Sequence, residues 1–88
     1  VEWGLGVLAG ALGRWAEAEK RLATTTALFR EMTARPFLAL ALYDHAAMLR
    51  AQGRSSDRRR TATLIDEAAA LADELGLEAL QRRIPSIR

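Results

Sequence analysis

The chain has 88 residues, half of them apolar and 27% charged, a composition that favours one small folded domain and excludes most free-standing enzymes. Thirteen basic against eleven acidic residues leave a net charge of +2, which is too small to indicate a nucleic-acid or membrane partner. Cysteine is absent, which excludes disulfides, thiol catalysis and cysteine-ligated metals and leads us to expect a cytoplasmic setting.

Eighteen alanines and fourteen leucines predict helix nearly everywhere and therefore an all-α fold. A first helix is expected over residues 2–12, ending at Gly13. It is too short to span a bilayer, and the spacing of its glycines indicates close approach of neighbouring helices. A second helix is expected over residues 15–34, with a buried stripe of Trp15, Ala18, Leu22, Thr25, Phe29 and Met32 and with Leu28 at its edge.

The third helix is expected to begin at Pro36, because the N–H groups of the first helical turn have no intrahelical acceptor and proline lacks only this group. Proline should also hold Arg35 outside the helix. The helix is expected to run to Gln52, and Gly53 is the expected left-handed stop. Its buried stripe comprises Leu38, Leu42, Ala46 and Leu49.

Ser55, Ser56 and Asp57 are good N-cap residues for a fourth helix that ends at Gly76. We expect its buried stripe to comprise Ala62, Ile65, Ala68 or Ala69, Ala72 and Leu75. Its acidic residues should face water without forming an acid-base pair: Asp66, Glu67, Asp73 and Glu74. A short fifth helix is expected over residues 77–83, and Pro85 prevents its continuation beyond Ile84.

An internal repeat relates the two helix pairs. A shift of 43 residues places Leu22 on Ile65, and a shift of 40 places Gly13 on Gly53, so the second pair carries about three extra residues in its turn. The sequence therefore predicts about two and a half helix-pair repeats in a single domain, itself a fragment of a larger protein. The units are 1–35, 36–76 and a partial capping helix at 77–84.

The spacing Leu5-Gly6-x2-Ala9 followed by Ala18-x3-Leu22 resembles the tetratricopeptide repeat. The second copy departs from that pattern, because His45 stands where a leucine is usual and Thr61 where an alanine is usual. The runs Leu-Gly-Arg-Trp-Ala-Glu-Ala at 12–18 and Ala-Arg-Pro-Phe-Leu-Ala at 34–39 are similar to the C-terminal arrays of large bacterial signalling ATPases. These include LuxR-type transcriptional regulators and nucleotide-cyclase fusions. The resemblance implies an α-α superhelix that binds a protein or peptide. We expect no enzymatic activity, because the chain offers no nucleophile, base and cofactor loop for one pocket.

In such arrays the first helices of successive pairs line a concave groove, and the resemblance implies which residues face it. They are Trp3, Val7, Leu40, Tyr43, Ala47 and Arg50, with Asp44 at the margin. Tyr43 and Arg50 are the strongest pair, because aromatic and guanidinium groups are enriched among interface hot spots. The alternative is that Tyr43 covers the seam between helices and that Arg50 is solvated.

Other chemistry-bearing residues favour structural interpretations. His45 lacks partners for a metal or a nucleophile and is expected to be a packed or hydrogen-bonded interior residue. Trp15 is expected to pack against the preceding helix. Arg54 and residues 58–60 form a basic turn without interleaved aromatics, which favours solvation over nucleic-acid binding. No phosphate-binding loop is present, so no cofactor is expected.

Self-association is an alternative function of a different class, because a short array exposes apolar ends and could form a homodimer. The candidates are Trp3, Leu5 and Leu8 at one end, and Leu77, Leu80 and Ile84 at the other. Nucleic-acid contact through Arg54–Arg60 ranks third.

Overall fold

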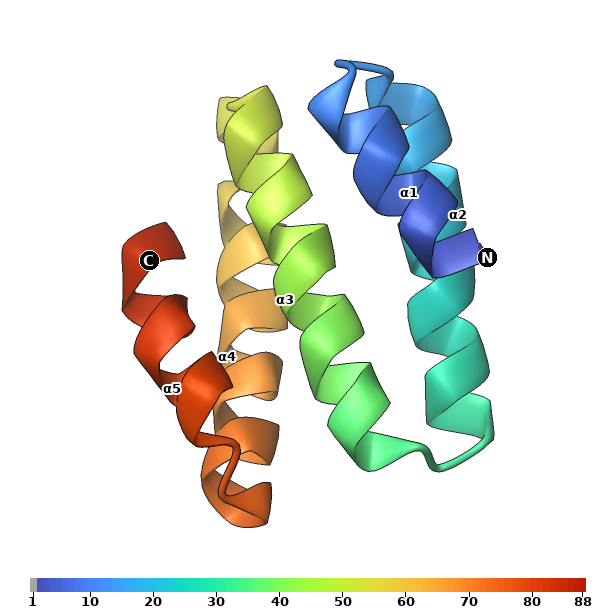
Figure 1. The fold of residues 1–88 in the computed structure, drawn as a ribbon. Coiled ribbons are helices and arrows are strands. Elements are labelled where there is room, and N and C mark those ends of the chain that lie inside the picture. The colour runs from blue at the N-terminus through green and yellow to red at the C-terminus, as the bar shows by residue number, and fades with distance from the viewer. Residues whose placement is uncertain (1) are drawn as a thin grey trace.

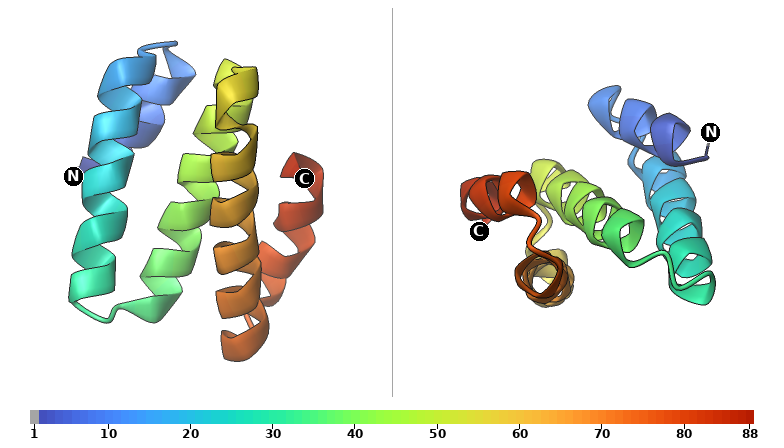
Figure 2. Two further views of the ribbon diagram at one scale, coloured as in Figure 1. Left: turned by 180° about the vertical axis from the view of Figure 1, so that it is seen from behind. Right: turned by 60° about the horizontal axis from the view of Figure 1, so that its bottom comes forward.

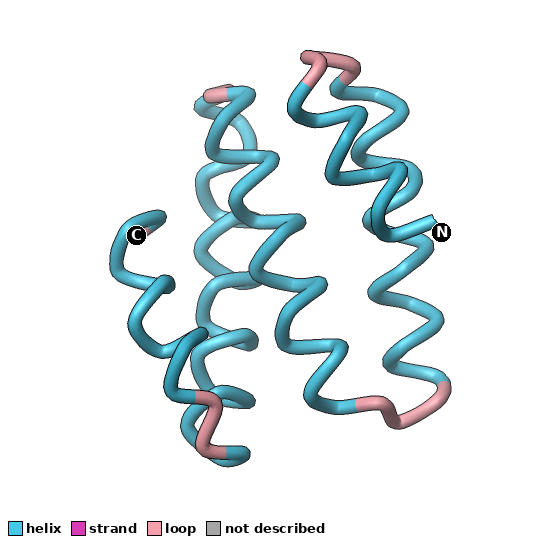
Figure 3. Tube along the Cα trace, in the orientation of Figure 1, coloured by secondary structure: helices cyan, strands magenta, loops and turns pink. Residues whose placement is uncertain are grey.

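The computed structural model describes residues 2–88, and within that range every element is helical and none is a strand. The elements are α1 (Glu2–Ala11), α2 (Trp15–Glu31), α3 (Arg35–Gln52), the 3-10 turn η1 (Ser55–Asp57), α4 (Arg58–Leu75), α5 (Glu78–Arg83) and the 3-10 turn η2 (Ile84–Ile87). The all-α prediction is confirmed, and the helices are joined by short loops (Figure 3). None of the helices in this range has the length and apolar character needed to cross a membrane.

The helices form two layers. Consecutive helices run antiparallel, and α1, α3 and α5 lie in front of α2 and α4 (Figure 1). The view from behind places α2 and α4 nearest the viewer, in agreement with this layering (Figure 2). Each of the four long helices packs against its neighbour in the chain, and η2 folds back onto α3. α3 is therefore the central helix of the domain.

The helix ends follow local backbone preferences. Gly13, Gly53 and Gly76 have φ values of 75°, 77° and 67°, so the left-handed stop predicted at Gly53 is confirmed and the helix ends at Gly13 and Gly76 have the same conformation. α2 ends three residues before the predicted position, because Thr33 takes the left-handed conformation with φ of 57°. The expectation that Arg35 lies outside the third helix is wrong. Arg35 is the first residue of α3, because Ala34 provides the break between the helices.

The buried core has two parts that share α3. One part joins α3 to α4, α5 and η2 through Leu42, Ile65 and Leu80, and the other joins it to α1 and α2 through Leu22 and Leu49. The predicted stripe of α3 is fully confirmed, and five further residues of that helix are also buried: Ala39, Ala41, Tyr43, His45 and Met48. A helix packed on several sides buries more than one stripe.

Two predicted core positions, Met32 and Ala62, are wrong, and Leu28, predicted at the edge of the stripe, is also exposed. Met32 is 61% exposed, because it follows the end of α2. Leu28 is 50% exposed on the outer side of α2. Ala62 is exposed in the first half of α4, which α5 does not cover. Trp15 is half-buried and packs on the part of the core that contains Ala9 of α1, as predicted.

α1 packs through its small residues. A Cβ on Gly6 would lie 2.9 Å from Leu22 Cγ, and one on Gly10 would lie 3.2 Å from Met48 Cγ, so the predicted close approach holds at these two glycines. The large aliphatic residues of α1 point outward, with exposed fractions from 39% to 54%: Leu5, Val7 and Leu8. Leu12, just after the helix, is 60% exposed. At the other end of the chain, Leu80 and Ile84 are 2% and 4% exposed, so the expected apolar surface there is wrong.

Candidate functional site

The predicted binding residues lie on α1 and α3. On α3, positions 40, 43, 44, 47 and 50 follow one another at intervals of one to four residues and share one side of the helix. We call the surface that α1, α3 and α5 form together in Figure 1 the odd-helix face. Val7 of α1 and Arg50 of α3 are exposed, whereas Trp3, Leu40, Asp44 and Ala47 are half-buried.

Trp3 and Asp44 connect α1 to α3. The indole Nε1 of Trp3 donates a hydrogen bond of 2.7 Å to Oδ2 of Asp44. The ring of Trp3 also meets Phe29 of α2 edge-on, with 5.5 Å between ring centroids. Burial raises the pKa of the Asp44 carboxyl above its usual value, while the bond from Trp3 and the charge of Arg83 lower it in part. The polar groups of Trp3 and Asp44 are therefore bonded to each other within the domain.

Tyr43 is covered by the end of α5. The guanidinium of Arg83 lies 4.6 Å from the centre of the Tyr43 ring, a cation-π contact, and only 7% of Tyr43 is exposed. Arg50, by contrast, is exposed and forms no ion pair within residues 2–88. Of the two residues expected to contribute most to partner binding, only Arg50 has its side chain free for an incoming group.

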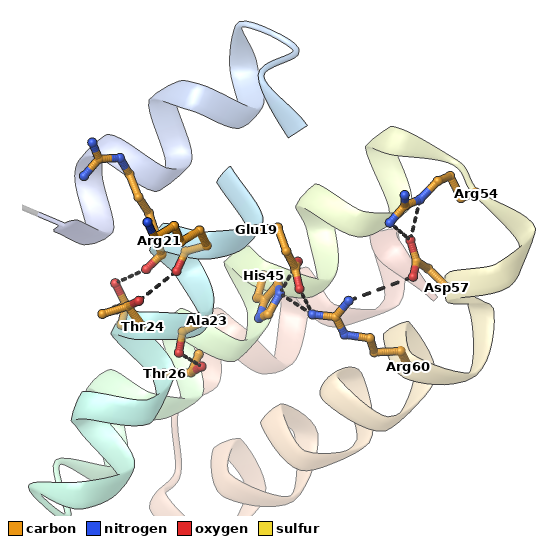
Figure 4. A network of polar contacts seen from close by, with 11 residues as sticks. Glu19, Arg21, Ala23, Thr24, Thr26, His45, Arg54, Asp57 and Arg60 are labelled. Carbon is orange, nitrogen blue, oxygen red and sulfur yellow. Dashed lines mark hydrogen bonds and ion pairs between the residues drawn. The ribbon is translucent and has the colours of Figure 1, made fainter. Parts of the chain in front are cut away.

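A polar network joins three helices on the other side of α3 (Figure 4). His45 is 3% exposed, and its Nε2 lies 2.8 Å from Oε2 of Glu19 on α2. The second oxygen of Glu19 pairs with the guanidinium of Arg60 on α4. The predicted interior, hydrogen-bonded position of His45 is confirmed.

The imidazole of His45 is a structural donor in this arrangement. Nε2 faces a carboxylate, so it carries the proton, and Nδ1 is buried without a hydrogen-bond partner. Burial lowers the pKa of His45, which favours the neutral ring. In the described part of the chain, no three residues of the His, Asp and Glu types come together as a metal site. The network therefore has the geometry of a connection between helices.

The four arginines of the basic turn, Arg54 and residues 58–60, do not all have the same environment. Arg54 donates to Asp57 at 3.0 Å, and Arg60 lies 3.9 Å from the other oxygen of Asp57 (Figure 4). Asp57 precedes α4 but makes no side-chain cap hydrogen bond. Its carboxylate pairs with Arg54 and lies near Arg60 instead. Arg58 and Arg59 are exposed. The turn is partly solvated, as predicted, but half of its arginines have intramolecular partners.

Sequence reasoning missed Glu19 as the centre of the network. Glu19 adjoins Ala18 on the predicted stripe, and an acidic residue at the edge of a buried stripe is a weak signal that it has a polar partner. Its partners are His45 and Arg60, which lie 26 and 41 positions further along the chain. No local sequence pattern specifies contacts at these separations.

Comparison with known proteins found no matching family model, no matching curated protein and no matching solved structure. The resemblance to tetratricopeptide repeats thus remains a prediction from motif spacing.

Proposed function

We propose that this domain is a helical-repeat interaction module of the tetratricopeptide type, with about two and a half helix pairs. It binds a protein or peptide on the odd-helix face. The observation that carries the proposal is the alternation of layers, because α1, α3 and α5 share one side of the molecule (Figures 1 and 2). First helices that share one side are the arrangement that gives repeat proteins an extended binding surface.

The surface chemistry of this face supports the same proposal. Val7 is 46% exposed, and Arg50 is exposed without an ion pair in the described chain. The half-buried Leu40 and Ala47 share the side of α3 that carries Arg50. An apolar strip next to an unpaired guanidinium suits a peptide that presents an apolar side chain and a carboxylate. On the resemblance of its motifs, we place the module in the regulatory part of a cytoplasmic bacterial signalling or transcriptional regulator.

Peptide selection tests this proposal. A random peptide library displayed on phage is selected against the protein, and the affinities of labelled selected peptides are measured by fluorescence anisotropy. The double variant Val7→Ala with Arg50→Ala should bind at least about tenfold more weakly, because hot-spot truncations cost more than 1 kcal/mol each. Its circular dichroism should be unchanged, since both side chains are exposed.

The matched control is Leu28→Ala with Arg59→Ala, which removes the same kinds of groups from the even-numbered helices. Leu28 is 50% exposed on α2, and Arg59 is exposed on α4. The control should bind the selected peptides like the parent protein. Equal weakening by both double variants, or failure to select any peptide that depends on Val7 and Arg50, would contradict the proposal.

Self-association is the second candidate function, and the outward side of α1 favours it. α1 buries Gly6 and Ala9 and leaves Leu5 and Leu8 39% and 54% exposed, the reverse of a usual surface helix. A second copy could cover these leucines. Sedimentation equilibrium should then show a dimer that Leu5→Gln with Leu8→Gln converts to a monomer, whereas Leu28→Gln with Phe37→Gln leaves it intact. A monomer at every concentration would contradict this function.

A further inference from the structure

A cavity of about 470 Å³ lies at the end of the domain where α3 finishes and α4 begins. Its walls come from the last turn of α3, η1, the first half of α4 and the last two residues of the chain. In Figure 1, α5 lies beside the opposite half of the α3 and α4 pair. The volume is within the range of small-molecule sites, roughly 300 to 1,000 Å³.

The charged side chains that line the cavity are all positive. Four arginines line the cavity, and no aspartate or glutamate does: Arg50, Arg54, Arg58 and Arg88. Two of these arginines are neutralised from outside the cavity, since Arg54 pairs with Asp57 at 2.9 Å and Arg88 pairs with Asp66 at 3.1 Å. Arg50 and Arg58 form no ion pair within residues 2–88. The cavity therefore holds two uncompensated positive charges.

The floor of the cavity is apolar. Leu49 and Ile65 are 1% and 4% exposed and belong to the core, and Ile87 is half-buried beside them. The hydroxyl groups of Ser55 and Thr61 stand on the wall. A guanidinium binds carboxylate or phosphate oxygens in a bidentate manner, while an apolar floor takes hydrocarbon or an aromatic ring. Both parts of the cavity would be used by a molecule that has an anionic head and an apolar body.

The lining does not suit nucleic acid. No aromatic side chain lines the cavity for base stacking. The arginines of the turn also do not form a continuous strip, because Arg60 is directed into the network with Glu19 and only Arg58 of residues 58–60 faces the cavity. We propose that this cavity is a binding site for an amphiphilic organic anion, whose head pairs with Arg50 and Arg58 and whose body contacts Leu49, Ile65 and Ile87.

Fluorescence titration of the protein with naphthalene derivatives tests the proposal. 1-Naphthyl phosphate and naphthalene-1-carboxylate carry the two candidate heads on the same body, 1-naphthol lacks the anionic charge, and inorganic phosphate lacks the body. At least one of the two anions should bind more tightly than both 1-naphthol and inorganic phosphate, and the better of the two identifies the head. If neither anion binds, or if 1-naphthol binds equally well, the proposal is overturned.

Two neighbouring arginines provide a matched pair of variants. Arg58 lines the cavity and Arg59 does not, and both are exposed, so Arg58→Gln and Arg59→Gln remove the same charge without loss of folding. Arg58→Gln should weaken binding of the anion about tenfold, the effect expected for a lost charged hydrogen bond, and Arg59→Gln should leave it unchanged. Equal weakening by both variants would show nonspecific attraction and overturn the site. So would tighter binding of a single-stranded oligonucleotide than of either naphthalene anion.

The cavity shares Arg50 with the proposed peptide-binding surface, so Val7 and Arg58 are the residues that separate the two proposals. Val7 and Leu40 do not line the cavity, and Arg58 does not belong to the odd-helix face. Loss of anion binding in Arg58→Gln with peptide binding retained would support the two sites separately. Each proposal can therefore fail without the other.

Discussion

His45 and Glu19 are joined by a contact of 2.8 Å between Nε2 and Oε2, and the other oxygen of Glu19 pairs with Arg60. One partly buried carboxylate thus connects α2, α3 and α4. The imidazole donates from Nε2 to a charged acceptor, and the guanidinium donates to the same carboxylate. Because a single side chain satisfies two donors, its removal affects both.

We expect Glu19→Gln to lower the free energy of unfolding by about 1 to 2 kcal/mol, because both donors lose the charged acceptor and His45 is buried. Glu17→Gln is the matched control on the same helix. Glu17 pairs with Arg21 on the surface, where an ion pair contributes less than about 0.5 kcal/mol. Urea unfolding followed by circular dichroism measures both variants, and an equal loss in the two would show that the network contributes nothing beyond surface pairing.

The stability of the protein should depend on pH through His45. Burial lowers its pKa in the folded state below the ordinary value of 6.5, so the unfolded chain binds more protons just below pH 6.5. The contribution of neutral His45 is therefore complete above pH 6.5 and is lost as the pH falls toward the folded-state pKa. Glu19 and Arg60 are the charged groups that face the ring.

The check is urea unfolding at neutral pH and at about pH 5, on either side of the histidine transition. The parent protein should lose stability over this interval, and His45→Gln should lose less, because glutamine still donates a hydrogen bond but does not titrate. Carboxylates elsewhere in the chain affect both proteins alike. An identical fall in the two proteins would assign the pH dependence to other groups.

The parts of the fold that could be predicted from the sequence are those set by local chemistry. Gly53 and Gly76 end their helices because glycine takes positive φ at no steric cost, and the α3 stripe follows from helical periodicity. The predictions of burial and of one helix end were wrong at positions where local sequence preferences do not determine the structure. Ala62 continues the periodic pattern of α4, but no helix covers its turn, and Thr33 takes a conformation that is uncommon for its residue type.

Two glycines of α1 should respond to alanine in opposite directions. A Cβ added to Gly4 would enter open space, with nothing within 4 Å, so Gly4→Ala should stabilise the helix by about 0.5 to 1 kcal/mol. Gly6→Ala would place its Cβ 2.9 Å from Cγ of Leu22, which is fully buried. The clash should exceed the gain in helix propensity and destabilise the protein by about 1 kcal/mol or more. Thermal unfolding of both variants is the measurement, and stabilisation by Gly6→Ala would contradict the packing of α1 on α2.

The candidate sites were less predictable than the helices, because each one combines distant segments. Arg58 was visible as part of a basic turn, but the cavity also needs Arg50 from α3 and Arg88 from the end of the chain. Tyr43 shows the reverse case. Its spacing on α3 indicated a binding residue, and the return of Arg83 from α5 covers it. Helical periodicity assigns a residue to a face of its own helix but does not specify which later segment packs there.

The hydrogen bond from the Trp3 indole to the Asp44 carboxylate joins α1 to α3. Asp44→Asn keeps an oxygen that accepts from the Trp3 indole and removes a charge that burial disfavours, so the free energy of unfolding at neutral pH should rise. That gain should disappear as the pH falls through the raised pKa of Asp44 and below its ordinary value of 3.8, because the parent carboxyl is then also neutral. Asp44→Ala should instead cost about 1 kcal/mol, since the indole N–H loses its acceptor. Urea unfolding at both pH values tests the three proteins together. If Asp44→Asn is as unstable as Asp44→Ala at neutral pH, the charge of Asp44, attracted by Arg83, matters more than its burial.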